Sequence, residues 1–97
     1  MKNFSGRVAV ITGAASGFGR EFALLGAKLG MKLVLADVQA AGLEATAGEV
    51  GALGAEAITQ LCDVRKDEQV AALAQAAMSR FGAVHLVFNN AGVGAGG

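Results

Sequence analysis

The sequence predicts an α/β fold in which a doubly wound parallel β-sheet lies between two layers of helices. Two observations predict it. Four short, continuous apolar runs alternate with three segments of helical periodicity, and each apolar run ends in polar or glycine residues. Continuous apolar runs are typical of strands buried on both faces, and their alternation with helices is typical of parallel strands joined by crossovers. The 97 residues are enough for one small domain, which we place at 1–97.

The four predicted strands end in residues suited to binding a ligand. Residues 8–11, 33–36, 57–62 and 84–88 form the strands. The residues that follow them are Thr12-Gly13, Asp37, Asp63 and Asn89-Asn90. Ligands of open α/β sheets bind outside the carboxyl ends of the strands. We therefore expect one site, built from these four strand ends.

Helical spacing predicts which residues of the three helices face the sheet. These are Phe22, Leu25 and Leu29 in the first helix, Leu43, Ala47, Val50 and Leu53 in the second, and Val70, Leu73, Ala77 and Phe81 in the third. Gly30, Gly54 and Gly82 are expected to end the helices. Three interior glycines, Gly42, Gly48 and Gly51, are expected to weaken the second helix by up to about 1 kcal/mol each.

Composition excludes several classes of function. The formal net charge is zero and the basic residues are scattered, so the basic surface of a nucleic-acid-binding protein is missing. No apolar run is long enough for a membrane span or a signal peptide, so we expect a cytoplasmic protein without a membrane partner. The single cysteine, Cys62, is expected to pack as a small apolar side chain, and His85 is expected to be structural. No spacing of residues indicates a metal site.

The segment Thr12-Gly13-Ala14-Ala15-Ser16-Gly17-Phe18-Gly19 joins the first strand to the first helix. The first glycine permits a sharp turn, the second permits close approach to a pyrophosphate, and the third lets the helix pack close to the sheet. The free N–H groups at the start of the helix would then face the phosphates. This context predicts a Rossmann-type dinucleotide site that uses Gly13, Ala15, Ser16, Gly17, Phe18 and Gly19. The alternative is a structural turn that binds nothing, and Arg20 just beyond it is expected to be solvated.

Asp37 predicts which dinucleotide binds. It lies 24 residues after Gly13 and ends the second strand, where an acid hydrogen-bonds the adenosine ribose of NAD. Its charge would repel the 2′-phosphate of NADP, and neither Val38 nor Ser16 supplies a compensating positive charge. We therefore expect NAD rather than NADP, with Asp37 and Val38 at the ribose. An ordinary helix N-cap is the alternative, and both roles can hold together.

Together these motifs resemble those of the classical short-chain dehydrogenases/reductases. The matching elements are Thr-Gly-x-x-x-Gly-x-Gly at residues 12–19, the pair Asp63-Val64, and Asn89-Asn90-Ala91-Gly92. They occur in order, each at the end of its strand, and the likeness covers essentially the whole chain.

The resemblance implies further cofactor contacts. It places the Asp63 carboxylate and the Val64 backbone at the adenine, and Phe18 where the family usually has Ile or Leu. The Asn-Asn-Ala-Gly segment would brace the sheet and border the adenosine ribose through Asn90, Ala91 and Gly92. From the sequence alone, Asp63 could instead be only a helix cap, and Asn89 only a buried bracing amide.

The resemblance also implies that the catalytic residues lie elsewhere. Family members are considerably longer, and their catalytic Ser, Tyr-x-x-x-Lys pair and further Asn lie downstream of the matched motifs. This chain has no tyrosine, so none of them can be mapped onto it. We expect an N-terminal portion that has no dehydrogenase activity alone and is marginally stable, because residues 84–88 would form an apolar sheet edge.

Three functions are compatible with these residues. The leading one is NAD(P)-dependent hydride transfer to or from a carbonyl or alcohol substrate by the full-length protein, which the resemblance implies is a homo-oligomer. The second is a non-catalytic module that binds a dinucleotide. The third is a methyltransferase that uses S-adenosylmethionine, whose loop usually reads Gly-x-Gly-x-Gly and does not match Gly13–Gly19.

Overall fold

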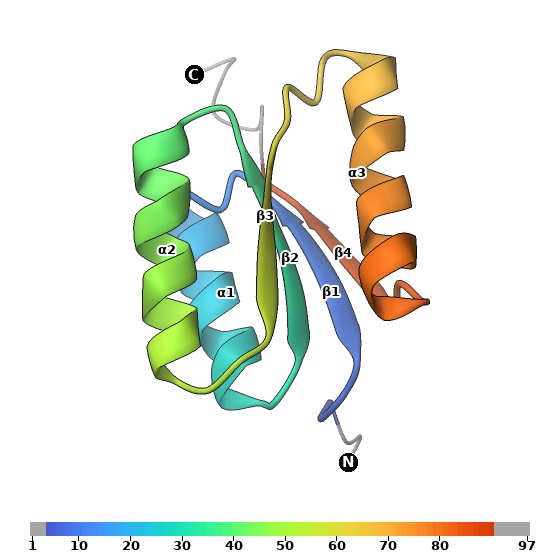
Figure 1. The fold of residues 1–97 in the computed structure, drawn as a ribbon. Helices are drawn as coiled ribbons and strands as arrows, with labels where there is room; N and C mark the ends of the chain where they lie inside the picture. Colours follow the sequence, from blue (N-terminus) through green and yellow to red (C-terminus); the bar gives the residue numbers. More distant parts are fainter. Residues whose placement is uncertain (1–3, 91–97) are drawn as a thin grey trace.

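The computed structural model describes residues 4–90, which form four strands and three helices in strict alternation (Figure 1). The strands are β1 (Val8–Thr12), β2 (Lys32–Asp37), β3 (Ala57–Leu61) and β4 (Leu86–Asn89), and the helices are α1 (Gly17–Lys28), α2 (Ala40–Ala52) and α3 (Asp67–Phe81). The predicted strand boundaries lie within two residues of these. Gly30, Gly54 and Gly82 follow the helices with positive φ, as expected of C-terminal stops.

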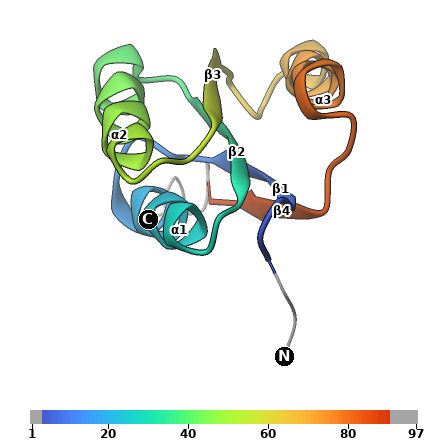
Figure 2. The ribbon, with the colours of Figure 1, turned by 60° about the horizontal axis from the view of Figure 1, so that its bottom comes forward.

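The sheet is parallel throughout and has the strand order β3-β2-β1-β4. Helices α1 and α2 cover one face and α3 covers the other (Figure 2). This confirms the predicted three-layer arrangement. Because the strands are parallel, all four carboxyl ends meet at one edge of the sheet, where the candidate site lies.

Two apolar cores lie on the two faces of the sheet. Alternate residues of β1 and β2 contribute to each, so that Ile11 and Leu35 face α1 and α2 while Val10 and Val34 face α3. All five residues of β1 are buried. Burial on both faces explains why these strands are continuous apolar runs rather than alternating ones.

Of the three residues of α1 that were predicted to face the sheet, only Phe22 packs against the core. The residues that pack fully are small, namely Gly19, Ala23, Gly26 and Ala27. Leu25 and Leu29 are 50% and 40% exposed, and Phe22 stacks on Phe88 of β4 with ring centroids 4.3 Å apart. A β-carbon added at Gly26 would lie 3.0 Å from Leu33 Cδ2 of β2. Small residues therefore bring α1 close to the sheet, and the large ones lie to the sides of the contact.

Helix α2 buries Leu43, Thr46 and Val50. Leu43 and Val50 were predicted, whereas Leu53 follows the last turn and is 46% exposed. The buried Thr46 was not predicted, because helical periodicity was followed through apolar residues and threonine carries a polar hydroxyl group. Its partner is in the candidate site described below.

The three glycines inside α2 are not equivalent, although the sequence treats them alike. A β-carbon at Gly48 or Gly51 would meet nothing within 4 Å, whereas one at Gly42 would lie 2.8 Å from Ala15 Cβ. We expect Gly48→Ala to stabilise the chain by about 0.5–1 kcal/mol. Gly42→Ala should destabilise it, because neither backbone nor an alanine methyl can move aside easily. Urea unfolding of the two variants checks this, and equal effects would contradict it.

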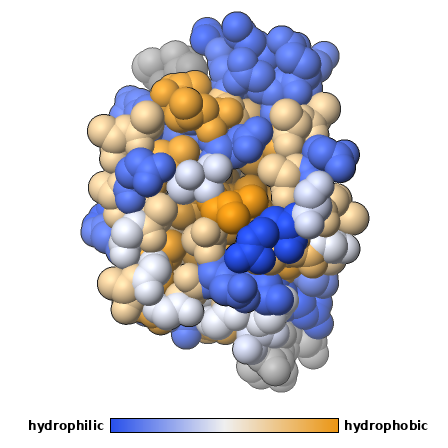
Figure 3. Space-filling view, viewed as in Figure 1, coloured by the Kyte–Doolittle hydropathy of each residue, from blue (hydrophilic) through white to orange (hydrophobic). Residues whose placement is uncertain are grey.

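Apolar side chains are exposed along both edges of the described sheet. Figure 3 shows the side of the molecule on which the β3 edge of the sheet lies, and apolar surface is visible there between the two helical layers. Leu61 of β3 and Val87 of β4 are each 60% exposed. In α3, Leu73 and Ala77 are buried as predicted, but Val70 is 41% exposed because it borders an open groove over β4.

Candidate functional site

The glycine loop, residues 12–19, connects β1 to α1 at the edge of the sheet where the carboxyl ends of the strands lie. Gly13 and Gly17 adopt φ angles of 69° and 60°, which only glycine adopts without strain. A β-carbon at Gly17 would meet nothing within 4 Å, so the space above it is open. Ser16 is the N-cap of α1, and its side chain makes no capping hydrogen bond. The first N–H groups of α1 therefore lack side-chain caps and are available to an anion.

Gly19 is required for a different contact from the one predicted. A β-carbon there would lie 2.6 Å from the Gly13 carbonyl carbon, and closer still to its oxygen. The close approach is therefore between the two ends of the loop itself. The close approach of α1 to the sheet, which was expected of Gly19, is made by Gly26.

Three hydrogen bonds hold the loop from outside. The Ala14 N–H donates to the Ala36 carbonyl of β2 at 3.0 Å. The Ala15 N–H donates to Asp37 Oδ2 at 2.9 Å, and Thr46 Oγ1 of α2 donates to the Ala14 carbonyl at 2.8 Å. These bonds within the chain fix the loop to β2 and α2 without the help of a ligand.

Asp37 lies at the end of β2 and is half-buried. Its second oxygen, Oδ1, accepts the N–H of Gln39 at 3.0 Å. The alternative that Asp37 is a helix N-cap is wrong, since Gln39 occupies that position and has no side-chain capping bond. Val38 and Phe18 are 63% and 77% exposed, which leaves apolar surface on both residues.

Asp63 follows β3 and carries a bidentate contact from Arg65. The Arg65 guanidinium donates to Oδ1 at 3.0 Å and to Oδ2 at 2.9 Å, and the Arg65 N–H also donates to Oδ1. The Asp63 N–H donates to Gln69 Oε1 of α3 at 2.8 Å. These bonds to Arg65 lower the pKa of Asp63 to about 2. Asp63 is not a helix cap, because Lys66 is the N-cap of α3.

The lowered pKa of Asp63 predicts a pH dependence. The carboxylate favours the folded chain above its unfolded pKa of 3.8, and this contribution is lost as pH falls toward 2. Replacing Arg65 with Gln should move the Asp63 pKa back toward 3.8, so that the pH range over which the carboxylate loses its stabilising effect becomes narrower. Titration of the Asp63 carboxyl carbon by NMR measures this pKa in the unchanged chain and in the variant. An unchanged midpoint in the variant would show that Arg65 does not hold the carboxylate.

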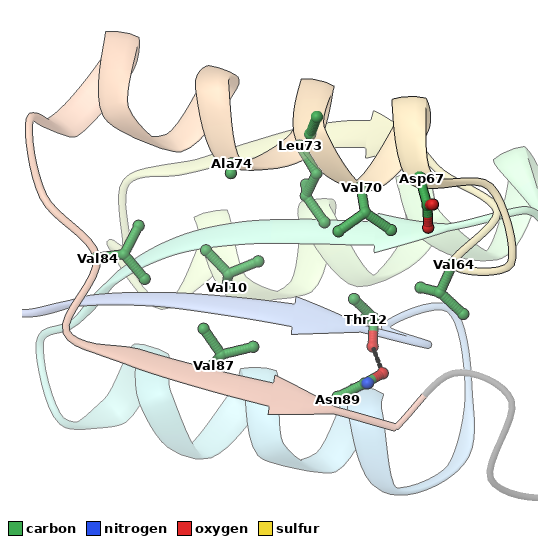
Figure 4. A pocket seen from close by; sticks show the side chains of 11 residues that line it. Val10, Thr12, Val64, Asp67, Val70, Leu73, Ala74, Val84, Val87 and Asn89 are labelled. Atoms are coloured by element: carbon green, nitrogen blue, oxygen red, sulfur yellow. Dashed lines mark hydrogen bonds between the residues drawn. The ribbon is translucent and has the colours of Figure 1, made fainter.

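Thr12 and Asn89 join the ends of β1 and β4. Thr12 Oγ1 donates to Asn89 Oδ1 at 2.7 Å, at one end of a groove of about 570 Å³ between α3 and β4 (Figure 4). Asn89 therefore braces the sheet as expected, but its side chain is exposed rather than buried. Asn90 is half-buried beside it. The remaining two predicted cofactor residues, Ala91 and Gly92, lie outside the described residues.

Cys62 and His85 have structural roles, as predicted. Cys62 is 3% exposed, and burial, together with the nearby Asp63 charge, raises the pKa of its thiol. His85 Nδ1 accepts the Val8 N–H at 2.9 Å, and the His85 N–H donates to the Val8 carbonyl. Within residues 4–90, no group of His, Cys, Asp and Glu side chains is arranged to hold a metal ion.

Arg20 pairs with a helix rather than with solvent. Its guanidinium makes two hydrogen bonds to Glu49 of α2, at 2.8 and 2.5 Å. The pair raises the pKa of Arg20 and lowers that of Glu49. The expectation of a solvated Arg20 was wrong, because α1 and α2 lie side by side on the same face of the sheet.

Comparison with known proteins identifies the family. The sequence model of the short chain dehydrogenases matches residues 7–97. The chain belongs to this family. A short chain dehydrogenase/reductase from Burkholderia phymatum, solved in complex with NAD, is 57% identical and superimposes with a TM-score of 0.87 over 90% of this chain. An NAD⁺-bound xylitol dehydrogenase is 35% identical, with a TM-score of 0.90 over 94% of the chain.

Sequence relatives of this chain include named enzymes. Levodione reductase from Leifsonia aquatica is 45% identical over 92 residues, which are 93% of this chain and 34% of that protein. The two solved structures are covered over 31% and 35% of their length. The chain thus spans about a third of the length of its relatives. In the part of the chain that the structure describes, no helix is long and apolar enough to cross a membrane.

Proposed function

We propose that this chain forms the NAD-binding part of an oxidoreductase that transfers hydride to or from a carbonyl or alcohol substrate. The observation that carries the proposal is the glycine loop. Its open space at Gly17 and uncapped helix start are held beside the Asp37 carboxylate by the bond from Ala15 to Asp37. A chain 57% identical to this one was solved with NAD.

The residues of the site fit the parts of a dinucleotide. The N–H groups at the start of α1 and the surrounding loop, Gly13 to Gly19, would bind the pyrophosphate. Asp37 would accept the adenosine ribose hydroxyls, with Val38 against the same sugar. Asp63 and Val64 would contact the adenine, and Asn90, Ala91 and Gly92 would border the ribose.

NAD supplies the hydride chemistry, and this chain supplies binding and orientation. The sequence contains no tyrosine, so the Tyr-x-x-x-Lys pair of the family is not within these 97 residues. A proton donor for the substrate oxygen would have to come from another part of the full-length protein. The second candidate, a module that binds the dinucleotide without catalysis, is favoured for the 97 residues by this same absence of tyrosine.

Titration with NADH, followed by nicotinamide fluorescence, tests the proposal. Saturable binding is expected, and excess NAD should displace the reduced form. The Gly48→Ala variant is a matched control, because Gly48 lies on the open side of α2 and its substitution should leave the affinity unchanged. No saturable binding by a chain whose circular dichroism shows it to be folded would overturn the proposed function.

A further inference from the structure

We propose that Thr46 of α2 is a positioning residue for the pyrophosphate of the cofactor. This inference rests on the proposed function and deepens it. Thr46 lies in the middle of α2, on the face of the sheet that α1 and α2 cover, and no motif includes it. It nevertheless reaches the glycine loop and fixes the orientation of one of its peptide groups.

The geometry of Thr46 is that of a buried anchor. Its side chain has 0% exposure. Its hydroxyl donates a 2.8 Å hydrogen bond to the Ala14 carbonyl, and Ala14 is itself 0% exposed. A buried carbonyl that loses its donor is costly, so the peptide of Ala14 is held strongly in one orientation.

A second contact from the same helix supports this role. Gly42, one turn before Thr46, lies against Ala15 so closely that a β-carbon would sit 2.8 Å from Ala15 Cβ and 3.1 Å from its carbonyl oxygen. Helix α2 therefore touches two successive loop residues, one through a hydrogen bond and one through packing. Residues at helical spacing i and i+4 lie on the same face, which is here directed at the loop.

The peptides that follow Ala15 are those with free N–H groups. Ser16 adopts an extended conformation, and α1 begins at Gly17. A change in the orientation of the Ala14 peptide would be transmitted along two residues to this helix start. Adenosine contacts are expected at Asp37 and Asp63 instead. Asp37 accepts the Ala15 N–H of the same peptide, but its other oxygen keeps the bond from Gln39 when the Thr46 hydroxyl is lost. Loss of the Thr46 hydroxyl should therefore weaken binding of a diphosphate much more than binding of adenosine.

The experiment compares ADP with adenosine in NMR titrations of the ¹⁵N-labelled chain. Thr46→Val keeps the volume and removes the donor, and Thr46→Ser restores the donor. Thr59→Val is the matched control, because the Thr59 hydroxyl bonds Glu44 on the other side of α2, away from the loop. We expect Thr46→Val to weaken ADP binding by about 5- to 10-fold, which corresponds to the loss of roughly one net hydrogen bond. Adenosine affinity should change by less than about twofold, and Thr46→Ser should be close to the unchanged chain.

Several outcomes would overturn this role. Equal losses for ADP and adenosine, no loss for either, or a Thr46→Ser variant as weak as Thr46→Val would each show that Thr46 is merely part of the core. If Thr46→Val does not fold, Thr46→Cys takes its place, since a thiol is a poor donor, and the same selective loss is expected. If the unchanged chain is folded and binds neither ADP nor NADH, the proposed function fails and this inference fails with it.

Discussion

Replacing Gly19 with alanine is expected to destabilise the chain by about 3 kcal/mol and to abolish dinucleotide binding. The added methyl would lie 2.6 Å from the Gly13 carbonyl carbon, and the obstacle is backbone at a turn that already needs a positive φ. The loop can relieve the clash only by moving Gly13 away from α1. That movement would also displace the N–H groups proposed to bind the pyrophosphate.

Urea unfolding and NADH titration together measure this effect. Gly48→Ala is the control, because it makes the same substitution inside a helix where a β-carbon meets nothing within 4 Å. It should raise the free energy of unfolding while Gly19→Ala lowers it. A Gly19→Ala variant as stable as the unchanged chain, with unchanged NADH affinity, would contradict the close approach of the two loop ends.

Substitution of Asp37 is expected to change the preference between NADH and NADPH and, separately, the affinity for either cofactor. The carboxylate would repel a 2′-phosphate, and it also accepts the Ala15 N–H of the loop. Asp37→Asn can keep the bond to Ala15 through its amide oxygen while removing the charge. Asp37→Ala removes both. We therefore expect the affinity for NADPH relative to NADH to rise by about tenfold in both variants, which corresponds to about 1.4 kcal/mol.

The absolute affinities distinguish the two roles of Asp37. NADH should bind most tightly to the unchanged chain, less tightly to Asp37→Asn and least tightly to Asp37→Ala, because only alanine also releases the loop. The preference of the unchanged chain for NADH should diminish at high salt, which screens the repulsion. Equal binding of NADH and NADPH by the unchanged chain would show that Asp37 does not select the cofactor.

Much of the fold could be predicted from the sequence because its signals are local. The apolar runs, the glycines that end the helices and the loop after β1 each occupy a few consecutive residues. The parallel sheet followed from their alternation. The strand ends Thr12, Asp37, Asp63 and Asn89 all lie at one edge, as the topology requires.

The errors arose where packing partners are distant in the sequence. A periodicity count weights large apolar residues, so it selected Leu25 and Leu29, although small residues allow α1 to approach β2 closely. The same count treats Gly42 and Gly48 alike, and only the position of Ala15 separates them. A polar residue within the apolar stripe of a predicted helix, such as Thr46, was the one available signal of a buried hydrogen bond.

The pairings of charged side chains were also beyond the sequence. Arg20 finds Glu49 on the neighbouring helix, at a separation that no local pattern reveals. Arg65 and Asp63 are only two residues apart, yet their contact depends on the turn between β3 and α3. Such pairings depend on backbone geometry that the residue types alone do not determine.

The most direct test of a dinucleotide site on this chain is a map of the amide shifts that NAD causes in the ¹⁵N-labelled protein. The proposed function predicts the largest changes in the loop from Gly13 to Gly19, with further changes at Asp37, Val38, Asp63 and Val64. Changes confined to Val70, Ala74, Val84 and Val87 in the groove between α3 and β4, or no change at saturating NAD in a folded chain, would contradict it.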